Sequence, residues 1–206
     1  MAFNYNTELK DASLLINFGG TFLQAFEFEG AKKDISGYRT SSWINTCLTT
    51  SPVYDVIDPD AVKFLNSICV NDFTKLTTKG MRHAILCNDK GQILTDGVCI
   101  RIAEDRYRTY WLTPVINYYM SVTDLDVHGE NMIGREYFIQ VDGEKSLEIL
   151  ENAFNQDLHD IRFATHRQID VDGKKVEVIS RNIMKYHRFL HHEIEKYEGK
   201  KEQKAA

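Results

Sequence analysis

The sequence predicts an α+β fold with mixed, largely antiparallel sheets and packed helices. Three observations support this prediction: short strand-like runs follow one another closely, turn residues join two of them, and amphipathic helical stretches separate others. With 206 residues, of which 43% are hydrophobic and 27% charged, the chain can bury a sizeable core. No Ser/Gly-rich linker interrupts it, so any lobes are expected to pack together.

The first 50 residues are expected to form a helical segment that packs on the first lobe. Apolar residues at helical spacing predict a helix over residues 7–18, which Gly19 and Gly20 would end. A second helix is predicted over residues 36–47, where Tyr38 and Trp43 could share a face.

A strand followed by a helix is predicted next. Residues 53–57 are apolar enough for a strand, and Asp58 as N-cap with Pro59 in the first helical position predicts that a helix follows. The same strand, turn and helix pattern returns at residues 138–150. We interpret the repetition as two related lobes that share one mixed sheet.

A hairpin is predicted in the middle of the chain. Residues 82–87 and 93–102 have the composition of strands, and the Asn, Asp and Gly of residues 88–91 suit a tight turn between them. Residues 106–113 are rich in Tyr and Trp and are expected to form the next strand.

Composition argues against several classes of partner. The formal net charge of −5 and the pI of about 5.8 give no general attraction for nucleic acid. The chain has no apolar run of membrane-spanning length and no signal-like start, so we expect a cytoplasmic protein without a membrane partner. Its four cysteines stand singly among apolar neighbours, which favours reduced thiols over disulfides or a metal cluster.

Several motifs occur in an order that is similar to the aminomethyltransferase (glycine-cleavage T-protein) superfamily. They are Asp58-Pro59-Asp60-Ala61, Val70-Asn71-Asp72-Phe73, and a stretch with Asn88, Gly91, Thr95 and Asp96. The family reads Gly-Pro-Asp-Ala, Asn-Asp-Val and Asn-x-x-Gly-Gly-x-x-Asp-Asp at these places. The resemblance covers roughly residues 14–182. Residues 114–118 and 137–178 resemble most closely the branch that demethylates aryl methyl ethers such as vanillate and syringate.

The resemblance implies a tetrahydrofolate in a central cavity, where it accepts a one-carbon unit from a small-molecule methyl donor. It also implies a first folate-binding lobe over residues 51–130 and a partial second lobe over 131–182. Residues 183–206 depart from the family as a divergent helix and tail, and the family's glutamate-bearing motif and C-terminal barrel domain are expected to be absent.

Asp96 is the catalytic candidate, because it aligns with the second acid of the family's Asp-Asp pair, and a carboxylate there suits a reaction that creates positive charge on nitrogen. Thr95 replaces the first acid. The resemblance implies that the cofactor is contacted by Asp96, Thr95, Asn71, Asn88, His83, Tyr110 and Asn117. The alternatives are a solvent-facing hairpin acid, turn-forming asparagines, an ordinary polar histidine and core aromatics.

No metal site is expected. His187 and His191 have helical spacing, but the sequence around them lacks the His-Glu-x-x-His order of zinc helices. Three functions are compatible with the sequence: a folate-dependent methyltransferase or O-demethylase completed by a second copy or a complementary subunit, a non-catalytic folate-binding or small-ligand module, and a relative that acts through protein interaction.

Overall fold

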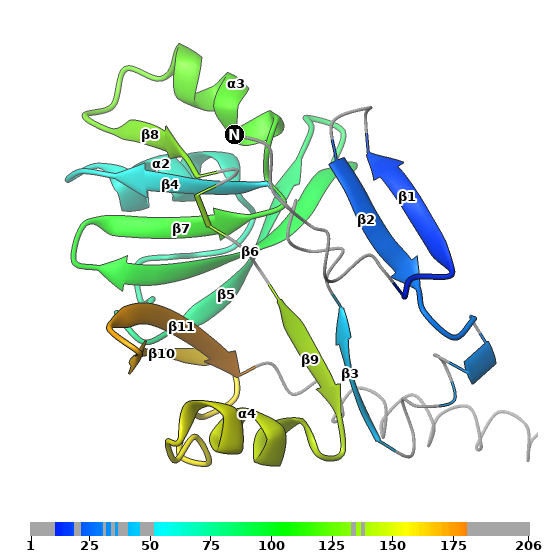
Figure 1. Cartoon of the computed structure of the whole chain (residues 1–206). Helices are drawn as coiled ribbons and strands as arrows, with labels where there is room; N and C mark the ends of the chain where they lie inside the picture. Colours follow the sequence, from blue (N-terminus) through cyan, green and yellow to red (C-terminus); the bar gives the residue numbers. More distant parts are fainter. Residues whose placement is uncertain are drawn as a thin grey trace, which may run out of the picture. The chain divides into compact units, whose positions relative to one another are not determined.

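The computed structural model describes residues 11–18, 22–30, 32–33, 36, 41–45, 52–132, 135–136 and 139–180 (Figure 1). The chain divides into two compact units, residues 1–160 and 161–206. Antiparallel sheets and three helices make up the described part of the chain, which confirms the predicted α+β fold.

A five-stranded antiparallel sheet is the centre of the first unit. Its strand order is β5 (Met81–Cys87), β6 (Ile93–Ala103), β7 (Arg106–Tyr110), β4 (Val53–Ile57) and β8 (His128–Asn131). The hairpin between β5 and β6 is confirmed. In the turn, the Gly91 N–H donates a hydrogen bond to the Asn88 carbonyl oxygen. Gly91 has a φ of +73°, a left-handed conformation that favours glycine.

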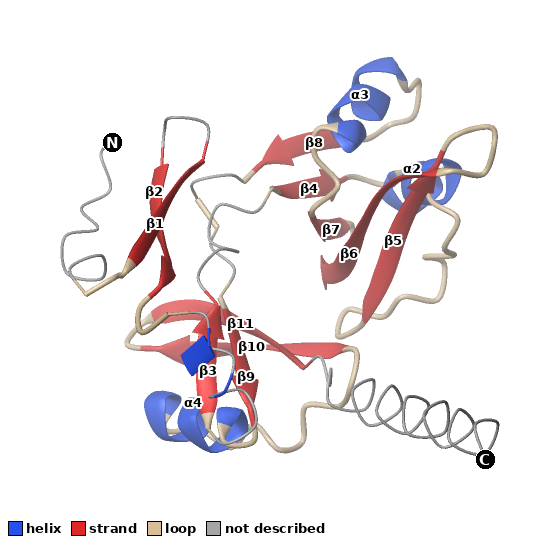
Figure 2. Cartoon of the chain, turned by 90° about the vertical axis from the view of Figure 1, so that its right-hand side faces the viewer, coloured by secondary structure: helices blue, strands red, loops and turns tan. Residues whose placement is uncertain are grey.

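The main hydrophobic core lies on one face of this sheet, where α2 (Ala61–Ile68) packs (Figure 2). Phe64 and Leu65 of α2 are at most 1% exposed and belong to one cluster with strand residues such as Val56 and Leu86. Ile116 of α3 (Val115–Val122) joins the same cluster. Each fully buried side chain of this size contributes roughly 1.5–3 kcal/mol, so this face fixes the sheet and its register.

The predicted start of α2 is wrong by two residues. The helix begins at Ala61 with Asp60 in the N-cap position, and neither it nor Asp58 caps the helix with its side chain. Asp58 has a φ of +94° and pairs with His128, whereas Asp60 bonds Lys63 at 2.6 Å. Asp60 also accepts a hydrogen bond from the Asp126 N–H at 3.2 Å, so both carboxylates are used by contacts other than a side-chain cap.

The smaller sheets contradict the two N-terminal helices. Leu14–Phe18 forms β1, which pairs with β2 (Phe22–Glu27), and Ser42–Asn45 forms β3, which pairs with β9 (Gln140–Gly143). Partner strands supply the backbone hydrogen bonds that a helix would make internally. Residues 7–10, 37–40 and 46–47 of the predicted helices lie outside the described residues.

The repeated strand, turn and helix is present at both places. In the second copy, β9 leads into α4 (Ser146–Phe154), but β9 and β4 lie in different sheets. Both edges of β4 are occupied by β7 and β8, so β9 pairs with β3. The expectation of one shared mixed sheet is therefore wrong.

The second unit contains, in its described part, the antiparallel hairpin of β10 (Thr165–Val171) and β11 (Lys174–Ser180). Within it His166 is buried and pairs with Glu177 across the two strands. The divergent helix expected over residues 183–206 lies outside the described residues. No helix in the described ranges is long and apolar enough to span a bilayer.

Candidate functional site

Asp96 and His83 lie on the face of the five-stranded sheet opposite α2. His83 is paired with Val98 and Asp96 with Ile85, so the two polar side chains are diagonal neighbours on adjacent strands. His83 Nδ1 and Asp96 Oδ1 are 3.3 Å apart, and the side chains are 50% and 54% exposed. The structure thus brings together two residues that the sequence motifs named separately.

Thr95 faces the opposite way from Asp96, because successive strand residues alternate between the faces of a sheet. Its Oγ1 donates to the carbonyl oxygen of Trp111 at 2.8 Å. This bond ties β6 to the segment that follows β7. Thr95 therefore positions that segment, and its hydroxyl proton is already in use.

The segment from Trp111 to Asn117 contains two unsatisfied polar atoms. Trp111 has a φ of +66°, which ends β7 three residues before the predicted end of the strand. Thr113 Oγ1 and Asn117 Oδ1 are buried and have no hydrogen-bond partner among the described residues. Leaving such an atom unpaired costs roughly 1–3 kcal/mol. Each of these two atoms can take up a hydrogen bond from a ligand or from a water molecule.

Thr113 was not among the predicted site residues. The signal for it in the sequence is slight, since it is simply the residue before Pro114 in the stretch that resembles the demethylase branch. Asn117 was predicted from that stretch, and the structure gives the prediction a physical reason.

Asn71 and Asn88 have structural hydrogen bonds. Asn71 Oδ1 accepts from the Ile85 N–H at 2.9 Å, which fixes the chain after α2 to the edge of β5. Asn88 Oδ1 accepts from the N–H groups of Lys90 and Gln92 at 3.0 and 2.9 Å inside the hairpin turn. The Asn88 bonds agree with the turn-forming interpretation, whereas the Asn71 bond joins two separate elements. A contact with cofactor stays a prediction for both.

The aromatic residues differ in what they can offer a ligand. Tyr110 is only 6% exposed, and its ring centre lies 6.0 Å from that of Trp111. Tyr118 is 63% exposed and packs edge-on against Tyr119. Of the four aromatics considered, Tyr118 presents the most free surface, whereas Tyr110 serves mainly to pack the sheet.

A buried ion-pair network lies on the same face as Asp96 and went unnoticed in the sequence. Asp55 is fully buried in β4 and accepts hydrogen bonds from Arg106 Nε at 2.7 Å and Arg108 Nε at 2.8 Å. Burial lowers the pKa of Arg108, but the hydrogen bond and charge of Asp55 more than offset this, so that its pKa is raised. Arg108 is therefore a permanent cation. An acid in the middle of the apolar run Val53–Ile57 was the available signal.

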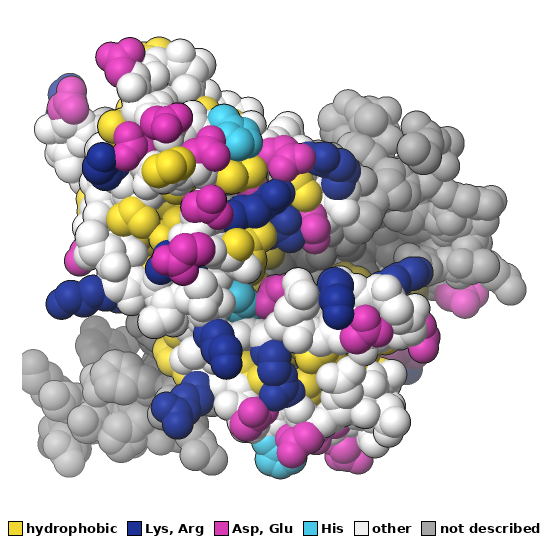
Figure 3. All heavy atoms as spheres, turned by 90° about the vertical axis from the view of Figure 1, so that its left-hand side faces the viewer, with side chains coloured by type: hydrophobic (Ala, Val, Ile, Leu, Met, Phe, Trp, Pro, Cys, Tyr) yellow, Lys and Arg dark blue, Asp and Glu magenta, His cyan; other side chains and the backbone are white. Residues whose placement is uncertain are grey.

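Charges elsewhere on the surface are mixed. The face seen in Figure 3 carries acidic and basic side chains side by side, with hydrophobic ones between them. The ion pairs His128–Asp58, Arg106–Glu130 and Arg135–Glu130 link strands and loops of the first unit.

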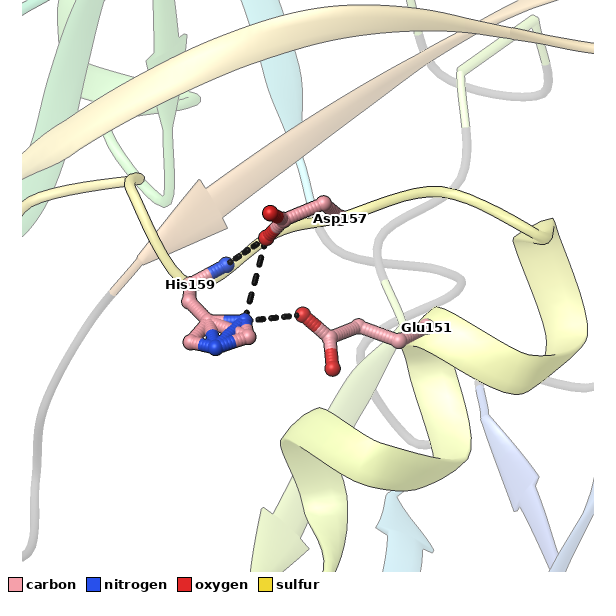
Figure 4. Close-up of side chains that lie close together, drawn as sticks. All are labelled: Glu151, Asp157 and His159. Carbon is pink, nitrogen blue, oxygen red and sulfur yellow. Dashed lines mark hydrogen bonds and ion pairs between the residues drawn. The ribbon is translucent and has the colours of Figure 1, made fainter.

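Glu151, Asp157 and His159 form a second cluster, at the end of α4 (Figure 4). His159 Nδ1 lies 2.8 Å from Glu151 Oε1 and 3.0 Å from Asp157 Oδ1. The same two carboxylates accept the N–H groups of Leu158 and His159. Three such groups could hold a divalent cation, but closure of the loop after α4 already accounts for their arrangement. The predicted helical pair His187 and His191 lies outside the described residues.

Two of the three thiols in the described part of the chain are poor nucleophiles. Cys69, Cys87 and Cys99 are free, as predicted, and Cys47 lies outside the described residues. Burial raises the pKa of Cys69 to about 12 and raises that of Cys99 as well. Both groups stay protonated at neutral pH and are therefore unsuited to act as nucleophiles.

Comparison with known proteins identifies the family. The pattern of the GCVT N-terminal domain matches residues 24–182. Sesamin methylene transferase from Sinomonas sp. is 46% identical over 169 residues, which cover 81% of this chain and 37% of that protein. Syringate O-demethylase from Sphingobium sp. is 21% identical, over 72% of this chain and 36% of that protein.

The crystal structure of glycine cleavage system aminomethyltransferase T from Bartonella henselae has a similar fold. Its TM-score is 0.68 at 16% identity, covering 79% of this chain and 45% of that one. The chain thus spans less than half the length of each of these three relatives. The match over residues 24–182 and the shared fold confirm the resemblance seen in the motifs: the chain belongs to the GCVT N-terminal domain family.

Proposed function

We propose that the chain takes part in tetrahydrofolate-dependent one-carbon transfer and carries the residues that hold the folate. Family membership supports the general chemistry, since relatives are named as aminomethyltransferase, methylene transferase and O-demethylase. The single observation that carries the proposal to this chain is the pair of buried acceptors without a partner among the described residues, Thr113 Oγ1 and Asn117 Oδ1, in the segment that Thr95 holds through the Trp111 carbonyl oxygen.

The residues fit a folate. A reduced pterin has a planar pyrimidine ring with several N–H donors, so it needs acceptors at its edge and a surface on which that ring can stack. Thr113 Oγ1 and Asn117 Oδ1 supply buried acceptors without a partner, and Asp96 supplies an accessible carboxylate. Each would gain a hydrogen bond that the described residues do not provide.

Asp96 has an electrostatic role in this proposal. Transfer of a one-carbon unit to an amine places positive charge on nitrogen before a proton leaves. A carboxylate presented at this position by β6 stabilises that charge.

The donor is proposed to be an ether-type small molecule that releases a methyl or methylene group from oxygen. The sequence identity of the chain is 46% with the sesamin methylene transferase and 21% with the syringate O-demethylase. This difference favours a methylene donor over the methoxylated aromatic expected from the motifs. An activity assay should therefore test both methylene donors and methoxylated aromatics.

The chain spans 36–46% of the length of the aminomethyltransferase, methylene transferase and O-demethylase relatives, so the reaction of those whole proteins is part of this proposal. The alternative functions are a non-catalytic folate-binding or small-ligand module and a relative that acts through protein interaction.

The test is calorimetric titration of tetrahydrofolate into the purified chain under anaerobic conditions. Asp96→Asn should weaken binding by about 10- to 100-fold, as expected for the loss of a charge-assisted hydrogen bond worth roughly 1.5–3 kcal/mol. Asp89→Asn, the same chemical change at an exposed position of the same hairpin, is the matched control and should bind like the wild type.

Saturable binding by the wild type and by Asp89→Asn, together with weaker binding by Asp96→Asn, would support the folate site. Absence of binding by a folded wild-type chain would refute it. The interaction-protein alternative would then be the better explanation of the conserved fold.

A further inference from the structure

We propose that His83 is the proton acceptor of this site and that Asp96 holds its imidazole in the tautomer that carries hydrogen on Nδ1 and a lone pair on Nε2. This inference rests on the proposed folate-dependent function. It gives a catalytic role to His83 and a positioning role, in addition to the electrostatic one, to Asp96.

The geometry is set by the backbone. Both residues belong to adjacent antiparallel strands, and the registers His83 with Val98 and Ile85 with Asp96 place them diagonally on one face. Their 3.3 Å separation is at the long end of the hydrogen-bond range, as is common in catalytic pairs before substrate is bound.

The tautomer follows from the chemistry of the partner. An ionised carboxylate can only accept a hydrogen bond, so the nitrogen that faces it must carry the hydrogen. In a neutral imidazole the other nitrogen then has the free lone pair. The same logic orients the histidine of acid–histidine pairs in hydrolases.

The lone pair is accessible in the described structure, since the His83 side chain is half exposed. Asp96 is the one ionisable partner that the described residues provide for His83. The neighbouring Arg82 is engaged elsewhere, because its guanidinium donates to the carbonyl oxygen of Asp72.

His83 suits the proton step better than Asp96 does. An imidazole is a stronger base than a carboxylate at neutral pH, whereas a carboxylate is the better fixed countercharge. His83 Nε2 takes the proton that leaves the amine nitrogen as that nitrogen bonds to the one-carbon unit. For a methyl ether, the carbon–oxygen bond of the donor breaks, its electron pair stays on oxygen, and that oxygen receives the proton from His83. For a methylene donor the same exchange happens twice, at two oxygens of the donor and two N–H groups of the acceptor. Charge and protons therefore balance without a further reagent.

The first arm of the test is nuclear magnetic resonance of the full chain with ¹⁵N-labelled histidine. Long-range ¹H–¹⁵N correlations report which ring nitrogen carries hydrogen, and the His83→Gln spectrum identifies the His83 signals among the seven histidines. The expected result is an Nδ1–H tautomer in the wild type that is lost in Asp96→Asn, whose amide can donate to Nδ1. An Nε2–H tautomer in the wild type, or no change in Asp96→Asn, would overturn the positioning role.

The second arm adds tetrahydrofolate to the same sample. The Nε2 resonance of His83 should move on saturation, and that of His159 should not. His159 is a matched control within the chain, since its Nδ1 also faces a carboxylate and its side chain is 63% exposed. His83→Gln should still bind tetrahydrofolate within about fivefold of the wild type, because one exposed hydrogen bond is worth little.

The outcomes separate the two proposals. If calorimetry shows tetrahydrofolate binding but the His83 Nε2 resonance does not respond, the proton-acceptor role is wrong and the proposed function stands. If the wild type gives the Nδ1–H tautomer but no binding heat, the proposed function fails, and the role of His83 toward folate fails with it.

Discussion

Replacement of Asp55 by alanine removes a carboxylate that is fully buried between two arginines of β7. Arg108 uses two nitrogens on this carboxylate, with Nε at 2.8 Å from Oδ1 and Nη2 at 2.9 Å from Oδ2. Arg106 Nε contributes a third bond at 2.7 Å. Asp55 lies in β4, which has strands on both sides, so the lost bonds cannot be replaced by rearrangement at an edge.

The expected loss of stability comes from the buried Arg108 charge that remains when Asp55 is removed. The Arg108 side chain is 11% exposed, and without Asp55 the one charged partner left to its guanidinium among the described residues is Glu136 at 2.8 Å. Removal of one member of a buried ion pair costs about 3–5 kcal/mol, because the remaining charge is left without compensation. Since domains are stable by about 5–15 kcal/mol, Asp55→Ala should lose a large part of the free energy of unfolding. Asp55→Asn keeps the shape of the side chain and part of its hydrogen bonding. Its free energy of unfolding should therefore lie between those of the alanine variant and the wild type.

The assay is urea unfolding followed by tryptophan fluorescence. Trp43 and Trp111 both belong to the unit of residues 1–160, so the signal reports the unit that contains Asp55. Glu130→Gln is the control, since Glu130 bonds the same Arg106 at 2.8 Å from a half-buried position where water can replace it. A loss below about 1 kcal/mol for Asp55→Ala, or equal losses for both variants, would refute the reasoning.

Three further changes test other contacts. Burial raises the pKa of the Asp142 carboxyl despite an opposing hydrogen bond from Gln140, so its charged form disfavours the fold at neutral pH. Asp142→Asn should therefore raise the melting temperature at pH 7. The gain should vanish below pH 3.8, the ordinary pKa of the carboxyl, because the group is then protonated in both the folded and the unfolded protein. A gain in melting temperature that does not change with pH would contradict this. Gly97→Ala would place Cβ 2.0 Å from the Tyr110 carbonyl oxygen, and should cost about 3 kcal/mol or more in urea unfolding; a neutral result would mean that β6 and β7 can separate. Thr95→Val deletes the bond to the Trp111 carbonyl at nearly constant volume, and should cost roughly 1–2 kcal/mol in the same assay, unless water reaches that oxygen.

The parts of the fold that sequence reasoning predicted are those decided by local patterns. The hairpin of β5 and β6 was predicted because Asn88 and Gly91 favour its turn chemistry regardless of the rest of the chain. The strands at 14–18 and 42–45 were mistaken for helices because their pairing decides their structure. Ser42–Asn45 pairs with Gln140–Gly143, so its partner is far away in the sequence. Helical spacing of a few apolar residues cannot outweigh such pairing.

The candidate site was predicted in part for the same reason. Motif order identified Asp96 and Asn117, but the contact between Asp96 and His83 depends on the register of two strands, which the sequence does not reveal. Thr113 and Asp55 were missed because their importance depends on burial. Thr113 Oγ1 is buried with no partner in the part of the chain that the structure describes, and Asp55 is buried between two arginines. Sequence composition describes which residues are present, whereas burial and partners decide what those residues can do.

The structure also explains why a threonine can stand where the family carries the first acid of its Asp-Asp pair. Position 95 faces the α2 side of the sheet, and its side chain donates to the Trp111 carbonyl oxygen at 2.8 Å. An ionised carboxylate has no hydrogen to donate and would be repelled by that oxygen. Position 96 faces the other side, where the carboxylate meets His83. Alternation along β6 therefore separates the two tasks: Thr95 holds the segment that leads to Asn117, and Asp96 alone keeps the charge for the proposed chemistry.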